Sequence, residues 1–379
     1  MKKVITMKKI ESIISIALIA SLVTGCSVTS TPTDTTATYY TSAIETIETS
    51  TAAESSETSE TEPTESTPRA KKEGHYKFKD HVFPEYMDEM MGKKIHEAYD
   101  NYIDAVLAGE DYFDCADQQT YDWMIGQCAY ACYPVIARYT GTAYADGFKN
   151  GKGMIRYDLP KDELKQKIEE FKTMIEGILN ETLEDDYSDF EKALALYIYF
   201  ADNYTYDYYA ADNFLDSDLW AYRVFTEKTG ICQEFSVAYS YLLLQAGVDA
   251  TVMSGRRSYD QASHQWSYAT INGKYYQIDP TYVIGNGYTL FYFLMDDNQR
   301  TEADTYVPAN SILCNAYATE TKKGFKRDSK YDCTDTSYQE IWKGNFDSMD
   351  TDNNILRYFT WDEDFNPVYH TFDYGALEN

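Results

Sequence analysis

Apolar residues recur at every third or fourth position after Cys232, and this pattern predicts a buried helix. The apolar positions are Phe235, Ala238, Tyr239, Leu242, Leu243 and Ala246. Gly230 marks a turn before this run, and Gly247 suits the first position beyond a helix end. The pattern therefore places Cys232 in the first turn of a core helix.

A strand and a β-hairpin are predicted after this helix. Residues 250–254 have the composition of a strand, and Asn272-Gly273 lies between two aromatic and β-branched runs, which is a strong hairpin signal. Counting outward from this turn pairs Ile271 with Lys274, Thr270 with Tyr275, Tyr268 with Gln277, Trp266 with Asp279, and His264 with Thr281. His264 and Asp279 then lie diagonally on one face, close enough for one hydrogen bond.

Two helices are predicted upstream of Cys232. The first begins at Leu159-Pro160, because Pro suits a first helical turn. Its apolar face carries Leu164, Ile168, Phe171, Ile175 and Ile178. The second begins at Ser188, which has the capping-box spacing to Glu191. We expect both helices to support the core from one side.

The patterns at the two ends of the folded part are weaker. Residues 77–107 have helical periodicity, whereas residues 134–157 alternate and predict a small pair of strands. Beyond Asp297 the pattern predicts strands and loops. Residues 288–295 are expected to continue the core sheet, and residues 355–374 to form a terminal hairpin.

Cys232, His264 and Asp279 have the residue types of a nucleophile, a base and a group that orients the base. A thiol is mostly protonated near neutral pH, so covalent catalysis needs a partner that removes the proton and a third group that fixes this partner's tautomer. A helix N-terminus favours a thiolate and can donate N–H groups to an oxyanion. Each residue alone is more often a packing residue, but the three on converging elements favour a triad.

Short motifs with a characteristic order run from Tyr187 to Tyr317. They occupy residues 191–194, 203–207, 230–232, 243–248, 254–255, 264–266, 272–276 and 279–281. In these motifs the chain resembles the transglutaminase-like superfamily, a group of cysteine enzymes whose catalytic mechanism is like that of papain. The resemblance implies an α+β fold in which a helix led by the catalytic Cys packs on an antiparallel sheet. It also implies Cys232 as nucleophile, His264 as general base and acid, and Asp279 as the orienting carboxylate.

The resemblance implies acyl transfer through a Cys thioester, with either an amine or water as the acceptor. An amine acceptor gives amide cross-linking, and water gives peptide or amide hydrolysis. The alternative is a non-catalytic surface binding module that keeps the fold.

The chain departs from the family at Gln233-Glu234, where small residues are frequent. Glu234 could cap the helix, or it could raise the pKa of the Cys232 thiol.

The N-terminus has the pattern of a secretory signal. Lys2, Lys3, Lys8 and Lys9 precede an apolar run over residues 13–23, which is too short for a comfortable membrane span. The segment Leu22-Val23-Thr24-Gly25-Cys26 resembles a bacterial lipobox. We therefore expect a signal peptide over residues 1–26, lipidation of Cys26, and anchoring on the outer face of a bacterial membrane. An ordinary signal peptide is the alternative.

Composition divides the rest of the chain. Residues 27–72 are rich in Ser, Thr and Glu and cannot bury a core, so they predict a disordered linker. We expect a small N-terminal α/β unit over residues 73–158, a transglutaminase-like catalytic domain over 159–320, and a β-rich extension over 321–379.

The formal net charge of −29 argues against nucleic acid as a partner. A protein or peptide substrate is expected, with cell-wall peptide as one candidate.

No cofactor or metal is expected. The five His residues lack ligand spacing, and no Asp-rich calcium loop is present. Beyond Cys26 and Cys232 the cysteines are Cys115, Cys128, Cys132, Cys314 and Cys333, an odd number that cannot all pair. Cys128 and Cys132 are four apart, but buried thiols or one disulfide are favoured over a metal site.

Aromatic residues leave two questions open. Tyr204, Tyr206, Tyr208 and Tyr209 could line a sugar or peptide groove, although packing is the favoured interpretation. The oxyanion hole is half assigned. The backbone N–H of Cys232 is one expected donor, and the second could be Tyr206, Trp220 or Tyr222.

Overall fold

The computed structural model describes residues 74–141, 146–214, 218–257, 262–304, 306–311 and 329–377. The predicted signal peptide with Cys26, the linker over residues 27–72, and Cys314 lie outside these ranges. Within the described ranges, no helix combines the length and the apolar character that a membrane crossing requires.

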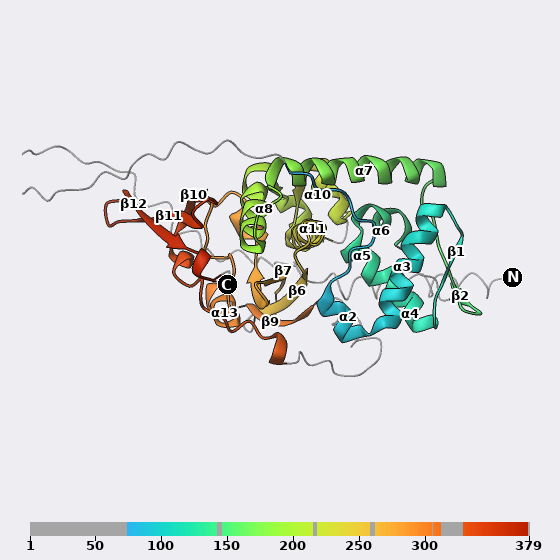
Figure 1. Ribbon diagram of the computed structural model, residues 1–379. Coiled ribbons are helices and arrows are strands. Elements are labelled where there is room, and N and C mark those ends of the chain that lie inside the picture. The colour runs from blue at the N-terminus through green and yellow to red at the C-terminus, as the bar shows by residue number, and fades with distance from the viewer. Residues whose placement is uncertain are drawn as a thin grey trace, which may run out of the picture.

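The centre of the molecule is an antiparallel sheet packed against a buried helix (Figure 1). The strand order is β8-β7-β6-β9, with β6 Ala250–Arg257, β7 Ser263–Ile271, β8 Lys274–Ile278 and β9 Tyr306–Ser311. The helix α11, Cys232–Gln245, packs on β6 and β7, and every one of its residues is buried. It begins at Cys232, and Gly247 follows it with a φ of 86°. The α+β core predicted from the sequence is confirmed.

The β7–β8 hairpin has the predicted turn and the predicted register next to it. Its pairs include Ile271 with Lys274, Thr270 with Tyr275, and Tyr268 with Gln277. Asn272 and Gly273 have φ values of 51° and 72°. A two-residue turn of this kind needs positive φ at both positions, and Asn-Gly supplies it with little strain.

The predicted register was wrong at the open end of this hairpin. Pairing stops at Ser267 and Ile278, so neither Trp266 with Asp279 nor His264 with Thr281 forms a pair. Pro280 lacks an N–H group and cannot continue the ladder. Asp279 instead caps a short helix, α12 Pro280–Val283, where its Oδ1 accepts the Thr281 N–H at 3.1 Å.

Helices cover the N-terminal end of the molecule and one side of the core (Figure 1). The N-terminal elements are α2 Glu85–Met91, α3 Lys93–Ala108, β1 Tyr112–Asp114, α4 Gln118–Trp123, the π-helix η1 Met124–Cys128, α5 Ala129–Cys132, α6 Pro134–Thr140, β2 Phe148–Lys149 and β3 Lys152–Met154. The strand pair predicted over 134–157 was therefore half wrong. Pro134 opens the helix α6, because Pro is well suited to a first helical position, whereas β2 and β3 do pair, and β3 also pairs with β1.

The two helices predicted upstream of Cys232 are confirmed as α7, Lys161–Thr182, and α8, Asp189–Asn203. The capping box of α8 forms in both directions, with the Glu191 N–H donating to Ser188 Oγ and the Ser188 N–H donating to Glu191 Oε2. Four shorter elements lead to Cys232: β4 Thr205–Tyr206, α9 Tyr208–Asp212, α10 Ala221–Glu227 and β5 Thr229–Gly230. β4 and β5 pair in parallel.

The C-terminal part differs from the prediction at two places. Residues 297–304 form the helix α13, Asp297–Asp304, instead of strands and loops. Residues 288–295 form turns, in which Tyr288 and Leu294 have φ values of 61° and 50°, and their described β-bridge to the core sheet joins Met295 to Gln277. The hairpin predicted over 355–374 is confirmed by β11 and β12.

The remaining C-terminal elements are η3 Ser329–Tyr331, η4 Ile341–Lys343, β10 Asn345–Asp350, β11 Ile355–Trp361, β12 Pro367–Asp373 and η5 Gly375–Leu377. β10, β11 and β12 form an antiparallel sheet at the end of the molecule opposite the N-terminal helices (Figure 1). One hydrophobic cluster runs through the described residues from Val82 to Tyr374. The division into units at residues 158 and 320 stays a prediction.

Candidate functional site

Cys232, His264 and Asp279 converge where α11, β7 and the start of α12 meet. His264 Nε2 lies 2.7 Å from Asp279 Oδ2, and the His264 ring also hydrogen-bonds to the Cys232 side chain. Because Nε2 faces Asp279, Nδ1 is the ring nitrogen that remains for the thiol. The structure therefore brings together the three residues that the sequence predicted, although Asp279 reaches His264 from a helix cap and not from a strand.

The three side chains are almost completely withdrawn from solvent. Cys232 is 1% exposed, His264 6% and Asp279 0%. Aromatic rings surround the imidazole, with ring centroids 5.0 Å away for Tyr306, 5.5 Å for Tyr282 and 5.8 Å for Trp266. Charges interact more strongly in such surroundings than in water, so the ionisation of each member depends on the other two.

Electrostatics favours a thiolate and an imidazolium at this site. Burial alone lowers the pKa of His264, but the negative charges of Asp279 and Cys232 and the hydrogen bonds to both outweigh it and raise the pKa to about 10. Burial alone would raise the pKa of Asp279, but His264 and then Arg300 hold it below its ordinary value. An imidazolium beside the sulfur is the condition under which a Cys is reactive near neutral pH.

Arg300 is a fourth charged residue of the site, and sequence reasoning missed it. Its Nη2 lies 3.2 Å from Asp279 Oδ2, the oxygen that His264 also binds, and both side chains are 0% exposed. The guanidinium carbon lies 4.2 Å from the Trp266 ring centroid. A buried charge is tolerated only when it is paired, so Arg300 and Asp279 keep each other ionised.

A helix start signal could have led to Arg300. Asp296 has the residue type of an N-cap, and its Oδ1 accepts the Gln299 N–H at 2.6 Å. This cap begins α13 and turns Arg300 inward, where it is completely buried. The helix was not predicted, because residues 297–304 have no apolar stripe.

Trp266 is fixed in place beneath both His264 and Arg300. Its Nε1 donates to Gln277 Oε1 at 2.6 Å, and Gln277 Nε2 donates to Asp297 Oδ1 at 2.8 Å. Trp266 and Gln277 are completely buried. This chain of bonds ties the hairpin to the first turn of α13, which orients the ring against which Arg300 packs.

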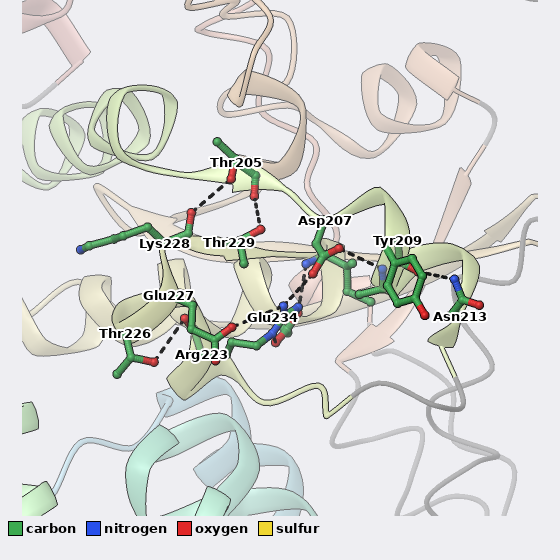
Figure 2. A network of polar contacts seen from close by, with 12 residues as sticks. Thr205, Asp207, Tyr209, Asn213, Arg223, Thr226, Glu227, Lys228, Thr229 and Glu234 are labelled. Carbon is green, nitrogen blue, oxygen red and sulfur yellow. Dashed lines mark hydrogen bonds and ion pairs between the residues drawn. The ribbon is translucent and has the colours of Figure 1, made fainter.

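A partly buried ion-pair network holds the segment that leads into Cys232, as Figure 2 shows. Arg223 binds Glu234 through two bonds, from Nε to Oε1 at 3.0 Å and from Nη2 to Oε2 at 2.7 Å, and its Nη1 lies 2.7 Å from Asp207 Oδ2. Glu234 Oε2 also accepts the Ile231 N–H at 3.1 Å. Of the two roles considered for Glu234, the helix cap is present, and Arg223 supplies a counter-charge to its carboxylate.

The same network fixes the turn before the helix. The Asp207 N–H donates to the Gly230 carbonyl at 2.8 Å, and Asp207 Oδ1 caps α9 at Ala210. A Cβ at Gly230 would lie 3.0 Å from Val224, so a larger residue would push the segment away from α10. The Cys232 backbone is therefore held by contacts on both of its sides.

Removing Arg223 is expected to destabilise the protein more than removing its buried partner. Arg223→Gln leaves the carboxylate of Glu234, whose side chain is 0% exposed, without a counter-ion, and the loss should be about 2–3 kcal/mol, because protonation of Glu234 relieves part of it. Glu234→Gln leaves Arg223 paired with Asp207, and about 1 kcal/mol is expected. Urea unfolding measures both. Equal losses of stability in the two single variants would contradict the role given to the network. So would a double variant, Arg223→Gln/Glu234→Gln, that recovers none of the stability lost in Arg223→Gln.

The candidates for the second oxyanion donor occupy different surroundings. Gln233 Nε2 donates to the Tyr130 hydroxyl at 2.7 Å, and the Tyr130 ring packs against Trp220 at 5.8 Å. Tyr222 instead packs against Tyr139 and Phe171, beside α7. The Trp220 ring is thus linked to the first turn of α11 through the Tyr130–Gln233 contact, whereas the ring contacts of Tyr222 are with Tyr139 and Phe171.

The tyrosine cluster after α8 divides into packing and exposed residues. Tyr204 is buried in the hydrophobic cluster and packs against Phe200 and Phe235. Tyr208 and Tyr209 are both 76% exposed. The packing interpretation is confirmed for Tyr204, and Tyr208 and Tyr209 remain candidates for a groove.

The other described cysteines are Cys115, Cys128, Cys132 and Cys333, and all four are buried and form no disulfide with one another. Burial raises the pKa of Cys115 to about 11 and raises the pKa of Cys132 well above its ordinary value. No group of His, Cys, Asp and Glu within the described residues could hold a metal ion. Unlike Cys115 and Cys132, Cys232 has a histidine that favours its ionised form.

Residues 176–280 match the family model of the transglutaminase-like superfamily. The matched range includes Cys232, His264 and Asp279 and ends before Arg300. No curated protein matches the chain.

Three solved structures are similar to this chain over part of its length. A structure described as a TGase is 21% identical, with a TM-score of 0.26, over 36% of this chain and 41% of that one. A candidate cysteine protease of Cytophaga hutchinsonii is 18% identical, with a TM-score of 0.22, over 31% and 34%. A candidate protease of Parabacteroides distasonis is 18% identical, with a TM-score of 0.23, over 35% and 30%. The match therefore spans less than half the length of each of these structures.

Proposed function

We propose, from the transglutaminase-like core that residues 176–280 carry, that this protein is a cysteine enzyme that transfers acyl groups through a thioester on Cys232. The observation that supports this most directly is the bond of 2.7 Å between His264 Nε2 and Asp279 Oδ2, with the Cys232 side chain bonded to the same imidazole. A packing cysteine has no need of a charged partner at its sulfur.

The proposed reaction has two halves. The Cys232 thiolate attacks the carbonyl carbon of a carboxamide or peptide bond, and the tetrahedral oxyanion is stabilised by the backbone N–H of Cys232 at the helix start. His264 gives its Nδ1 proton to the leaving amine as the C–N bond breaks, which leaves a thioester. An amine or a water molecule then gives a proton to His264 and attacks the thioester, and the thiolate is released.

The charged neighbours act on His264 and not on the substrate. Asp279 accepts a hydrogen bond from the Nε2–H group of His264, which presents Nδ1 to the sulfur and stabilises the imidazolium. Arg300 holds the shared oxygen of Asp279 from the other side. Both are therefore positioning residues.

The pH dependence of Cys232 alkylation by iodoacetamide, from pH 5 to 9, tests this proposal. In the wild type we expect a rate that is already high near pH 6, because the thiolate is paired with the imidazolium. In His264→Ala the rate should rise only above roughly pH 8.5. Cys232 is only 1% exposed, so the absolute rate also depends on how easily iodoacetamide reaches the sulfur. The readout is therefore the shape of the pH profile. Two profiles that both rise near pH 8.5 would favour the binding module instead.

The acyl acceptor is identified by products. A glutamine peptide incubated with a primary amine gives a cross-linked amide if the acceptor is an amine, and glutamate with released ammonia if it is water.

We also propose, from the segment before Cys26, that the protein is lipid-anchored on the outer face of a bacterial membrane, where protein or peptide, including cell-wall peptide, would be the substrate. Membrane fractionation of a Cys26→Ser variant tests the anchor.

A further inference from the structure

A hollow of about 730 Å³ lies between α13 and the segment around η4, outside the triad. Its lining includes Phe291, Asp296, Gln299, Glu302, Glu340 and Trp342. None of Cys232, His264 and Asp279 contributes to it. A hollow of this size is large enough for a side chain and part of a peptide backbone.

Three aromatic residues connect this hollow to the candidate catalytic histidine. The ring centroids of His264 and Tyr282 are 5.5 Å apart, Tyr282 stacks on Tyr292 at 4.2 Å, and Tyr292 meets Phe291 at 5.1 Å. We call Tyr282, Tyr292 and Phe291 the aromatic strip. All three are partly exposed, and Phe291 also lines the hollow. The strip therefore leads from His264 to the hollow.

The aromatic strip is tied to the triad through its backbone. The Asp279 N–H donates to the Tyr292 carbonyl at 2.9 Å. This bond fixes the backbone at Tyr292 and its neighbour Phe291 relative to Asp279, the residue that orients His264. A ligand lying along the strip would have one end at the triad and the other in the hollow.

The chemistry of the lining favours a positively charged group. Asp296, Glu302 and Glu340 supply three carboxylates, against one ammonium from Lys343. Asp296 accepts the Gln299 N–H, and Glu340 accepts the Tyr358 hydroxyl at 3.2 Å, but neither bond neutralises a charge. The rings of Phe291 and Trp342 also favour a cation.

A donor in the same lining suits a peptide carbonyl. Gln299 Nε2 is buried without a hydrogen-bond partner among the described residues. Buried amide groups are normally satisfied, so a turn of the Gln299 side chain that brings this amide to the hollow would let a peptide carbonyl oxygen accept its hydrogen bond.

We propose that the hollow and the aromatic strip form a subsite that binds an ammonium-bearing segment of a peptide substrate, such as a lysine side chain. This inference rests on the proposed function and adds a substrate class to it. The reactive carbonyl would lie at Cys232, and the charged side chain would lie several residues away along the chain.

Binding to a Cys232→Ala variant tests the subsite without catalysis. The probes are fluorescein-labelled peptides that carry one Gln and one Lys, with the Lys placed one to six residues to either side, and matched peptides with Nε-acetyl-lysine. Fluorescence anisotropy should show roughly tenfold tighter binding for the charged form at the preferred spacing. In Glu302→Gln/Glu340→Gln this preference should disappear.

The control is Glu363→Gln/Asp364→Asn, which removes two charges from the exposed turn between β11 and β12. It should keep the preference. Equal binding of the charged and acetylated peptides would overturn the proposal. So would an equal loss in the control, since the effect would then come from the overall charge of −29. Failure of the alkylation test alone would remove the proposed function and leave the binding result standing.

Discussion

Asp279→Asn is expected to lower the rate of acyl transfer by about 10³–10⁴-fold and the free energy of unfolding by about 3–5 kcal/mol. The change keeps the size of the side chain but removes the charge that, more than any other attraction, raises the pKa of His264. The imidazole then no longer has a carboxylate that fixes its tautomer. Arg300, which is completely buried, also loses its counter-charge. Steady-state kinetics and urea unfolding measure the two effects.

The double variant Asp279→Asn/Arg300→Met separates these effects. Met removes the stranded cation and keeps an unbranched side chain against Trp266, so most of the lost stability should return. The activity should stay low, because the tautomer of His264 is still not fixed. If Asp279→Asn left stability unchanged, the account of a mutually dependent buried pair would be wrong.

Arg300→Met alone is expected to lower the free energy of unfolding by about 3–5 kcal/mol, since Asp279 is then buried with one partner fewer. Loss of a positive charge also makes every nearby proton harder to remove. The alkylation profile of Cys232 should therefore shift to higher pH by about one unit. The profile is a readout that a purely structural role for Arg300 would not move.

Arg300→Lys is the matched control. Lysine keeps the charge but cannot stack a planar group on Trp266, whose ring centroid lies 4.2 Å from the guanidinium. We expect the alkylation profile to stay close to that of the wild type while part of the stability is lost. A profile displaced as far in Arg300→Lys as in Arg300→Met would show that packing, and not charge, carries the effect.

Local signals allowed much of the site to be predicted from the sequence. The apolar spacing after Cys232 and the Asn-Gly turn each depend on neighbours a few residues apart, and both gave the correct element. Asp279 was placed near His264 correctly but for the wrong reason, because the effect of Pro280 on the ladder was overlooked.

The parts that could not be predicted depend on distant partners. No spacing in the sequence connects Arg300 with Asp279, and a lone arginine in a polar segment is usually exposed. In residues 288–295 the apolar side chains of Leu290, Phe293, Leu294 and Met295 are buried in turns, and burial alone does not distinguish a turn from a strand. Tertiary packing decided both cases.

The separation of the triad along the chain has a consequence for how the protein is made. Cys232 begins α11, His264 lies on β7 further along the chain, and Arg300 lies on α13 further still. Because a long loop must close before such contacts form, we expect contacts between residues so far apart to form late in folding. Until the sheet closes on α11, Cys232 is an ordinary thiol with no histidine beside it. If Cys232 is the proposed nucleophile, we expect the newly synthesised chain to be protected from its own chemistry, with the reactive sulfur appearing only in a molecule that has finished folding.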